Sequence, residues 1–156
     1  MIWIAGYVAS IALVNVAFVH LPHIPLGDNG ILPAATFLVG AVFILRDFAQ
    51  RSAGHWVLAA MVIGIAISYV MAGPMVALAS GAAFAVSELA DYAVYTLTKR
   101  PLKTRILLSS AVGTPIDTVV FLALLPFDGA LNIVAVLAMI AAKMVSAISV
   151  WSYLDR

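Results

Sequence analysis

Charged side chains stand inside long apolar runs of this sequence, and they constrain the fold more than any other feature. Only 10% of the 156 residues are Asp, Glu, Lys or Arg, whereas 65% are hydrophobic. A water-soluble domain would cover its surface with more charge, so the composition indicates a membrane-embedded chain. Six of the charged residues fall within the apolar runs: Arg46, Asp47, Glu88, Asp91, Asp117 and Lys143.

The apolar runs have the length of membrane helices, which need about 20 residues each. We expect six spans, separated by connections rich in proline and glycine, near residues 2–20, 31–48, 56–72, 75–98, 106–125 and 130–153. The first run is too long for a signal peptide and has no basic region before it, so we expect it to be retained. The predicted fold is all-α, a single six-helix transmembrane domain over residues 1–156.

Positive charge is distributed unevenly over the connections. Lysine and arginine occur in the second and fourth connections and at the C-terminus, and the first, third and fifth connections contain none. Because positive residues are retained on the cytoplasmic side, this pattern predicts that the N- and C-termini are both cytoplasmic.

Several classes of function are disfavoured by what the sequence lacks. Cysteine is absent, which excludes disulfides, thiolate metal sites and cysteine nucleophiles. A net charge of +1 is too small for a nucleic-acid-binding face. No histidine pair has the spacing of a helical metal site, and no serine stands in a nucleophile turn. We therefore predict no metal, no cofactor, no catalytic residue and no enzymatic activity.

The charges at mid-membrane depth should face a cavity lined by protein, because each costs about 2.5–3.5 kcal/mol at the centre of a bilayer. Asp117 and Lys143 fall near the middle of the fifth and sixth spans, and we predict that they form an ion pair and leave Glu88 available to a ligand. Glu88 and Asp91 share a helical face with Tyr92 beside it. Two carboxylates this close require that one is protonated or that a cation lies between them. The alternative is a satisfied polar network that only sets the helix register.

Polar residues nearer the ends of the spans have more than one interpretation. Arg46 and Asp47 lie at the cytoplasmic end of the second span, where an interfacial role is as plausible as a functional one. Asp47 and Arg51 are four residues apart, which predicts a structural ion pair. Asn15, in the outer half of the first span, either caps a neighbouring helix or contacts a polar ligand.

Four segments resemble a known family of transporters. They are FLVGAVFILRDFAQRSAGH with Asp47, Arg51 and Gly54, ASGAAFAVSELADYAVYTLTKR with Glu88 and Asp91, VGTPIDTVVFLAL with Gly113, Thr114, Asp117 and Thr118, and AAKMVSAISV with Lys143. In the order and depth of these charges, residues 31–153 resemble the putative vitamin uptake transporter family, whose best-known members are queuosine precursor transporters. Thr114 and Glu88 stand where amides are expected in that family.

The resemblance implies uptake of 7-cyano- or 7-aminomethyl-7-deazaguanine across the bacterial inner (plasma) membrane by a multi-pass protein. It also implies a six-span fold like that of the substrate-binding subunits of energy-coupling-factor importers. A carboxylate would accept the N–H donors of the guanine-like edge, a lysine or amide would donate to its carbonyl, and aromatic rings, with Phe84 a further candidate, would enclose the ring. The substrate-binding residues are then Asn15, Phe37, Glu88, Asp91, Tyr92, Asp117 and Lys143.

Partners and alternative functions follow from the same features. Six spans are few for two halves that move against each other, so we expect a homodimer in the lipid bilayer. One alternative is a substrate-capture subunit of an energy-coupling-factor vitamin importer, in which Ala5 and Ala9 on the first helix would dock a scaffold. The other alternative is a non-transport membrane scaffold, although such a protein has no need of charges at mid-membrane depth.

Overall fold

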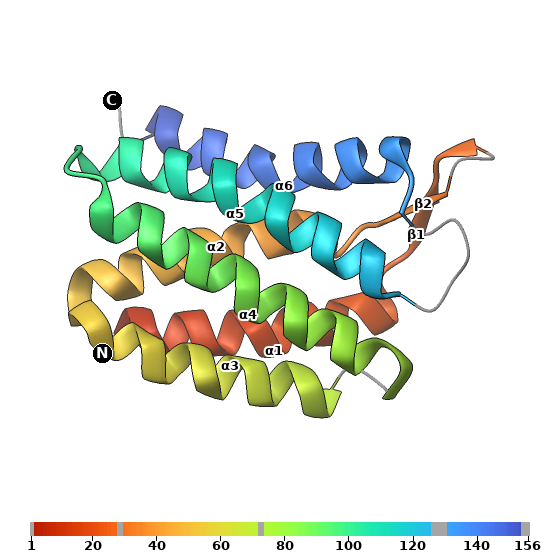
Figure 1. The fold of residues 1–156 in the computed structure, drawn as a ribbon, viewed down its shortest axis with the longest axis horizontal. Coiled ribbons are helices and arrows are strands. Elements are labelled where there is room, and N and C mark those ends of the chain that lie inside the picture. Colours follow the sequence, from red (N-terminus) through yellow and green to blue (C-terminus); the bar gives the residue numbers. More distant parts are fainter. Residues whose placement is uncertain (1, 28–29, 72–73, 126–130, 154–156) are drawn as a thin grey trace.

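The computed structural model describes residues 2–27, 30–71, 74–125 and 131–153, with only the backbone for residues 74–77. Helices account for most of the described chain (Figure 1). The elements in chain order are α1 (Ile2–His20), β1 (His23–Pro25), β2 (Ile31–Pro33), α2 (Thr36–Ala53), the short 3-10 helix η2 (Gly54–Trp56), α3 (Val57–Met71), α4 (Pro74–Leu97), α5 (Leu102–Leu124) and α6 (Ile133–Tyr153).

The helices run roughly side by side, and the two ends of the bundle differ (Figure 1). One end, called here the terminal end, holds the start of α1, the end of α6, and the connections from α2 to α3 and from α4 to α5. The opposite end, called the hairpin end, holds β1 and β2. The basic residues of the second and fourth connections therefore lie at the same end as the two termini.

The hairpin changes the expected start of the second helix. We expected a span from residue 31, but residues 31–33 pair with β1 in an antiparallel hairpin, and α2 begins at Thr36. Each strand ends in a proline, Pro25 in β1 and Pro33 in β2. Proline disfavours helix formation because it has no N–H to donate. Between the strands, Gly27 and Gly30 have positive φ angles of 66° and 115°, a conformation that glycine adopts without strain.

Glycines permit close helix packing at two places. A Cβ atom on Gly40 of α2 would collide with the backbone carbonyl of Lys143 on α6. A Cβ atom on Gly64 of α3 would collide with the side chain of Ile11 on α1. Small residues at such positions let helix backbones approach closely, as is common in membrane proteins. The Gly40 contact also holds the Lys143 backbone directly against α2.

Apolar side chains cover the outside of the bundle, whereas the charged side chains of the apolar runs lie inside it. Leu13, Val70 and Leu78 are 59%, 82% and 70% exposed, while Arg46 and Glu88 are 0% exposed. This is the distribution expected of a protein surrounded by lipid. Within the described residues, four helical stretches are long and apolar enough to cross a membrane, namely Ile2–His20, Thr36–Met71, Leu102–Leu124 and Ile133–Tyr153. The second of these spans α2, η2 and α3. The chain is a multi-pass membrane protein.

Candidate functional site

A cavity of about 70 Å³ lies inside the bundle, and residues from α1 to α6 all contribute to its wall. It lies in the half nearer the hairpin end, because its lining comes from the late part of α1, α3 and α5 and the early part of α2, α4 and α6. Its polar lining residues are Asn15, Ser68, Ser80, Glu88, Asp117 and Lys143. Four phenylalanines line it as well: Phe18, Phe43, Phe84 and Phe121. The cavity thus combines an aromatic wall with a few charged groups.

An ion pair occupies one side of the cavity and confirms the predicted partner of Lys143. Lys143 Nζ lies 2.7 Å from Asp117 Oδ2 and donates a second hydrogen bond of 2.7 Å to Thr118 Oγ1. The other carboxylate oxygen of Asp117 accepts a 3.2 Å hydrogen bond from Ser87 Oγ. Lys143 is 1% exposed, so its charge is compensated within the bundle.

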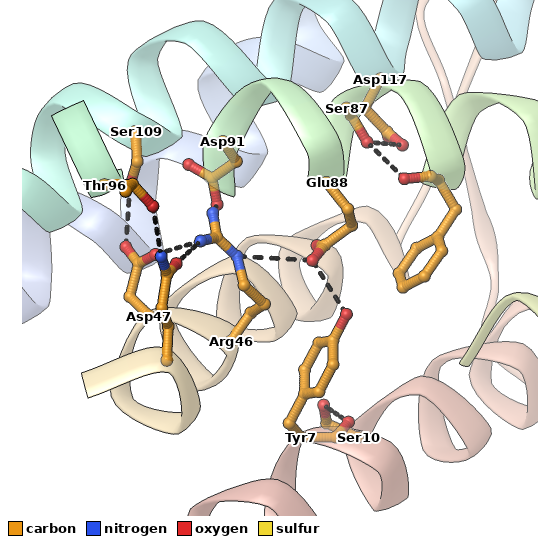
Figure 2. Close-up of polar contacts among 12 residues, drawn as sticks. Tyr7, Ser10, Arg46, Asp47, Ser87, Glu88, Asp91, Thr96, Ser109 and Asp117 are labelled. Carbon is orange, nitrogen blue, oxygen red and sulfur yellow. Dashed lines mark hydrogen bonds and ion pairs between the residues drawn. The ribbon is translucent and has the colours of Figure 1, made fainter. Parts of the chain in front are cut away.

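Glu88 forms another part of the wall and has one carboxylate oxygen without a partner. Its Oε2 accepts a 2.8 Å hydrogen bond from the hydroxyl of Tyr7 and lies 3.4 Å from Nε of Arg46 (Figure 2). Its Oε1 is buried and has no hydrogen-bond partner among the described residues. A buried carboxylate oxygen in this state is costly, so it is a natural acceptor for a donor that enters the cavity.

A second group of polar residues lies closer to the terminal end of the bundle. We call it the Arg46 cluster, and it consists of Arg46, Asp47, Gln50, Asp91, Thr96 and Ser109. Figure 2 shows the Arg46 guanidinium between carboxylates from α2 and α4. Because Arg46 also faces Glu88, the cluster begins directly behind the wall of the cavity.

The contacts of the Arg46 cluster connect three helices. Arg46 pairs with Asp47 at 3.1 Å, forms an ion pair with Asp91, and donates a 2.6 Å hydrogen bond to Gln50. Ser109 of α5 donates a 2.7 Å hydrogen bond to Asp47. These contacts join α2, α4 and α5 in the terminal half of the bundle.

Two expectations about α2 differ from the structure. Arg46 and Asp47 are fully buried, which excludes the interfacial position considered from the sequence. The expected ion pair of Asp47 with Arg51 is wrong, because Asp47 is held by Arg46 and Ser109. Arg51 lies in the last turn of α2 and is exposed, so its long side chain reaches the surface while the buried carboxylate takes the partner inside the bundle.

The other predicted binding residues are divided between the cavity and its surroundings. Asn15 borders the cavity and donates hydrogen bonds of 2.9 Å to the Ile11 carbonyl and 3.1 Å to Ser68 Oγ, which joins α1 to α3. Phe37, Asp91 and Tyr92 are not among the described residues that line the cavity.

Each of these three residues has a different position in the bundle. Phe37 is 40% exposed near the start of α2, and its carbonyl accepts a hydrogen bond from Ser146. Asp91 belongs to the Arg46 cluster, and the Tyr92 hydroxyl is hydrogen-bonded to His55. The structure therefore brings together Asn15, Glu88, Asp117 and Lys143, with Phe84 as the aromatic partner.

Sequence reasoning missed Tyr7 and Phe18 of α1. Tyr7 is fully buried and holds Glu88, and Phe18 lines the cavity. With 3.6 residues per turn, their separation by 11 residues places both on one face of the helix. A tyrosine hydroxyl inside an apolar span was the available signal, because such a group needs a polar partner when it is buried.

Clusters that could hold a metal ion are not found among the described residues. Residues 68–154 match the putative vitamin uptake transporter family. The chain belongs to this family. No curated protein and no solved structure matches the chain.

The family match covers the end of α3 and all of α4, α5 and α6. These elements supply Glu88, Asp117 and Lys143, which are the charged residues of the described cavity wall, so all three belong to the region that matches the family. Asn15 and Arg46 come from α1 and α2, which precede it. Membership of this family indicates that the chain is a membrane transporter.

Proposed function

We propose that this protein is a standalone transporter that imports a queuosine precursor, 7-cyano- or 7-aminomethyl-7-deazaguanine, across the bacterial inner membrane. The observation that carries the proposal is the cavity enclosed by α1 to α6, with the Lys143–Asp117 pair and the unpartnered Glu88 oxygen in its wall. Polar groups inside a membrane bundle are costly and commonly mark a substrate pathway. A transport family and a polar internal cavity together favour transport over catalysis or a scaffold role.

The proposed topology has six membrane spans with both termini in the cytoplasm. Its support is the concentration of Lys and Arg in the connections at the terminal end, which also holds the start of α1 and the end of α6. The chain has no native cysteine, so single cysteines report accessibility cleanly. An impermeant maleimide should label Ile24→Cys in intact cells, and Lys99→Cys only after the cells are permeabilised. The reverse pattern would contradict this orientation.

In this orientation the cavity lies in the outer half of the membrane and the Arg46 cluster in the inner half. The substrate would enter from outside, and the ion pairs of Arg46 with Asp47 and Asp91 would obstruct its way to the cytoplasm. Release to the cytoplasm would then require the contacts between α2, α4 and α5 to rearrange. Such alternation between an outer and an inner opening is the general behaviour of secondary transporters.

The chemistry of the cavity suits a flat aromatic ligand, but its present size does not. Four phenylalanines can enclose a purine-like ring, and neutral polar groups such as Asn15 and Ser68 can contact its edge. A volume of about 70 Å³ is well below the roughly 300–1,000 Å³ of typical small-molecule sites. Binding would therefore have to widen the space between the helices. Glu88 could accept a single donor through Oε1, because its Oε2 already faces Tyr7 and Arg46.

We further propose that the transporter is a homodimer, since six spans are few for two halves that move against each other. Mass measurement in lipid nanodiscs tests this. A monomer at working concentrations would contradict it.

A second candidate function is a substrate-capture subunit of an energy-coupling-factor vitamin importer. The observation in its favour is that Ala5 and Ala9 are both exposed on α1, one turn apart, where another helix could approach closely. Uptake in cells that lack any energising module separates the two candidates. A standalone transporter works in such cells, whereas a capture subunit only binds its ligand.

The test of the proposed function is uptake of both radiolabelled 7-deazaguanines by a bacterial strain that lacks its own precursor transporter and precursor synthesis. The parent protein should accumulate at least one of them, and Lys143→Met should not. Ser149→Ala is the matched control on the same helix, because Ser149 is exposed and its hydroxyl donates to the Val145 carbonyl within α6. Absence of uptake of both compounds by well-inserted parent protein would refute the proposal.

A further inference from the structure

The interior of the bundle has more negative than positive groups. Among the described residues, four carboxylates and two cations meet inside it: Asp47, Glu88, Asp91, Asp117, Arg46 and Lys143. The side chain of Asp117 is 14% exposed, and the other five are at most 1% exposed. Uncompensated charge is costly at this depth. The interior can therefore accept further positive charge.

Buried carboxylate oxygens without a hydrogen bond occur on Asp47, Glu88 and Asp91, and among these three residues Glu88 is the one that lines the cavity. Lys143 compensates Asp117 at 2.7 Å, and Arg46 is shared among Asp47, Asp91 and Glu88. The contact of Arg46 with Glu88 is the longest of these, at 3.4 Å, and leaves Oε1 of Glu88 without a hydrogen bond among the described residues. Glu88 also lines the cavity, whereas Asp47 and Asp91 do not appear in its described wall. A positive group that enters the cavity would meet Glu88.

The rest of the cavity wall also suits a cation. Phe18, Phe43, Phe84 and Phe121 line the same space as Glu88. The face of an aromatic ring attracts positive charge, and phenylalanine offers no hydrogen-bond donor to an anion. Aromatic side chains that surround a carboxylate are a common way to bind an organic ammonium group. The nearby positive charge of Lys143 is already held by Asp117.

We propose that the cavity selects a ligand with a protonated amine, which binds Oε1 of Glu88 while its apolar part lies among the phenylalanines. An ammonium group would add a charge-assisted hydrogen bond and compensate one negative charge. Resting on the proposed function, this makes 7-aminomethyl-7-deazaguanine the preferred substrate over the neutral 7-cyano compound. The two ligands share a ring and differ in the charge of one substituent.

A proton on Glu88 is the competing way to compensate the charge, and it would favour neither ligand. The charged or titratable groups that contact Glu88, contact its partner Arg46 or share the cavity wall come from five helices: Tyr7 of α1, Arg46 and Asp47 of α2, Asp91 of α4, Asp117 of α5 and Lys143 of α6. The two explanations differ in ligand preference, which can be measured.

The experiment is equilibrium binding of the two labelled 7-deazaguanines to purified protein in nanodiscs at neutral pH. The parent should bind the aminomethyl compound at least about tenfold more tightly than the cyano compound, as one charge-assisted hydrogen bond would give. Glu88→Gln keeps the shape of the side chain and an acceptor for Tyr7, and it should remove this preference. Ser149→Ala, a change at an exposed residue outside the described wall, should preserve it.

Each outcome gives a separate answer. Equal binding, tighter binding of the cyano compound, or a preference that survives Glu88→Gln would overturn the cation site and leave the proposed function standing. If neither deazaguanine binds, the proposed function fails. The binding affinities of benzylamine and benzyl alcohol, measured separately on the same protein, then decide the inference. A Glu88-dependent preference for benzylamine supports the cation site, and no preference overturns it. If Glu88→Gln does not fold, the ligand preference of the parent decides.

Discussion

Neutralising Lys143 should destabilise the protein more than neutralising Lys143 and Asp117 together. In Lys143→Met, Asp117 loses its 2.7 Å ion pair and keeps one hydrogen bond from Ser87, at 3.2 Å. The Thr118 hydroxyl also loses a donor. The carboxylate then remains in an apolar bundle without a compensating charge.

The expected magnitude follows from the burial of the pair. Removal of one partner from a buried ion pair costs about 3–5 kcal/mol, whereas replacement of both partners by neutral groups is often close to neutral. The side chain of Asp117 is 14% exposed, so the value should lie toward the lower end, near 3 kcal/mol. The double variant Lys143→Met with Asp117→Asn should recover more than half of the loss.

The assay is reversible unfolding in mixed micelles, in which the free energy of unfolding is measured for the parent, both single variants and the double variant. The coupling energy from this cycle should be at least about 1.5 kcal/mol, above the 0.5 kcal/mol that separates interacting from independent sites. Losses that simply add in the double variant would refute the reasoning, because they would mean that the two charges do not compensate each other.

Two further changes test the packing and the hydrogen bonding around the cavity. Gly40→Ala should lower the free energy of unfolding by about 1–3 kcal/mol, because the added Cβ collides with the Lys143 carbonyl. Gly6→Ala, where a Cβ meets no described atom within 4 Å, is its matched control and should cause no loss. Tyr7→Phe should lower the same free energy by about 1–3 kcal/mol, because it removes the 2.8 Å hydrogen bond to buried Glu88. An unchanged value for Tyr7→Phe would show that Glu88 does not depend on this donor.

Helix positions were largely predictable, because span length and hydrophobicity are local properties. The expected spans 75–98 and 130–153 agree within three residues with α4 (Pro74–Leu97) and α6 (Ile133–Tyr153). The hairpin was not predictable in the same way. Residues 31–33 are as apolar as the residues of the membrane helices, so composition does not distinguish them. Pairing with residues 23–25 makes them a strand.

The sequence alone determined that the chain is built from apolar helices and that its deep charges need partners inside it. The partner of Lys143 followed from this, since Asp117 is an acid at matching depth in an apolar surrounding. Which groups would share the cavity was decided only by tertiary structure. Asp91 is three residues from Glu88 on the same helix, and both pair with Arg46, but those three residues shift Asp91 by about 4.5 Å along α4. Glu88 lines the cavity, whereas Asp91 is not part of its described wall. Helical periodicity defines which residues share a face of a helix. The packing of neighbouring helices determines which partners that face contacts at each position along the helix axis.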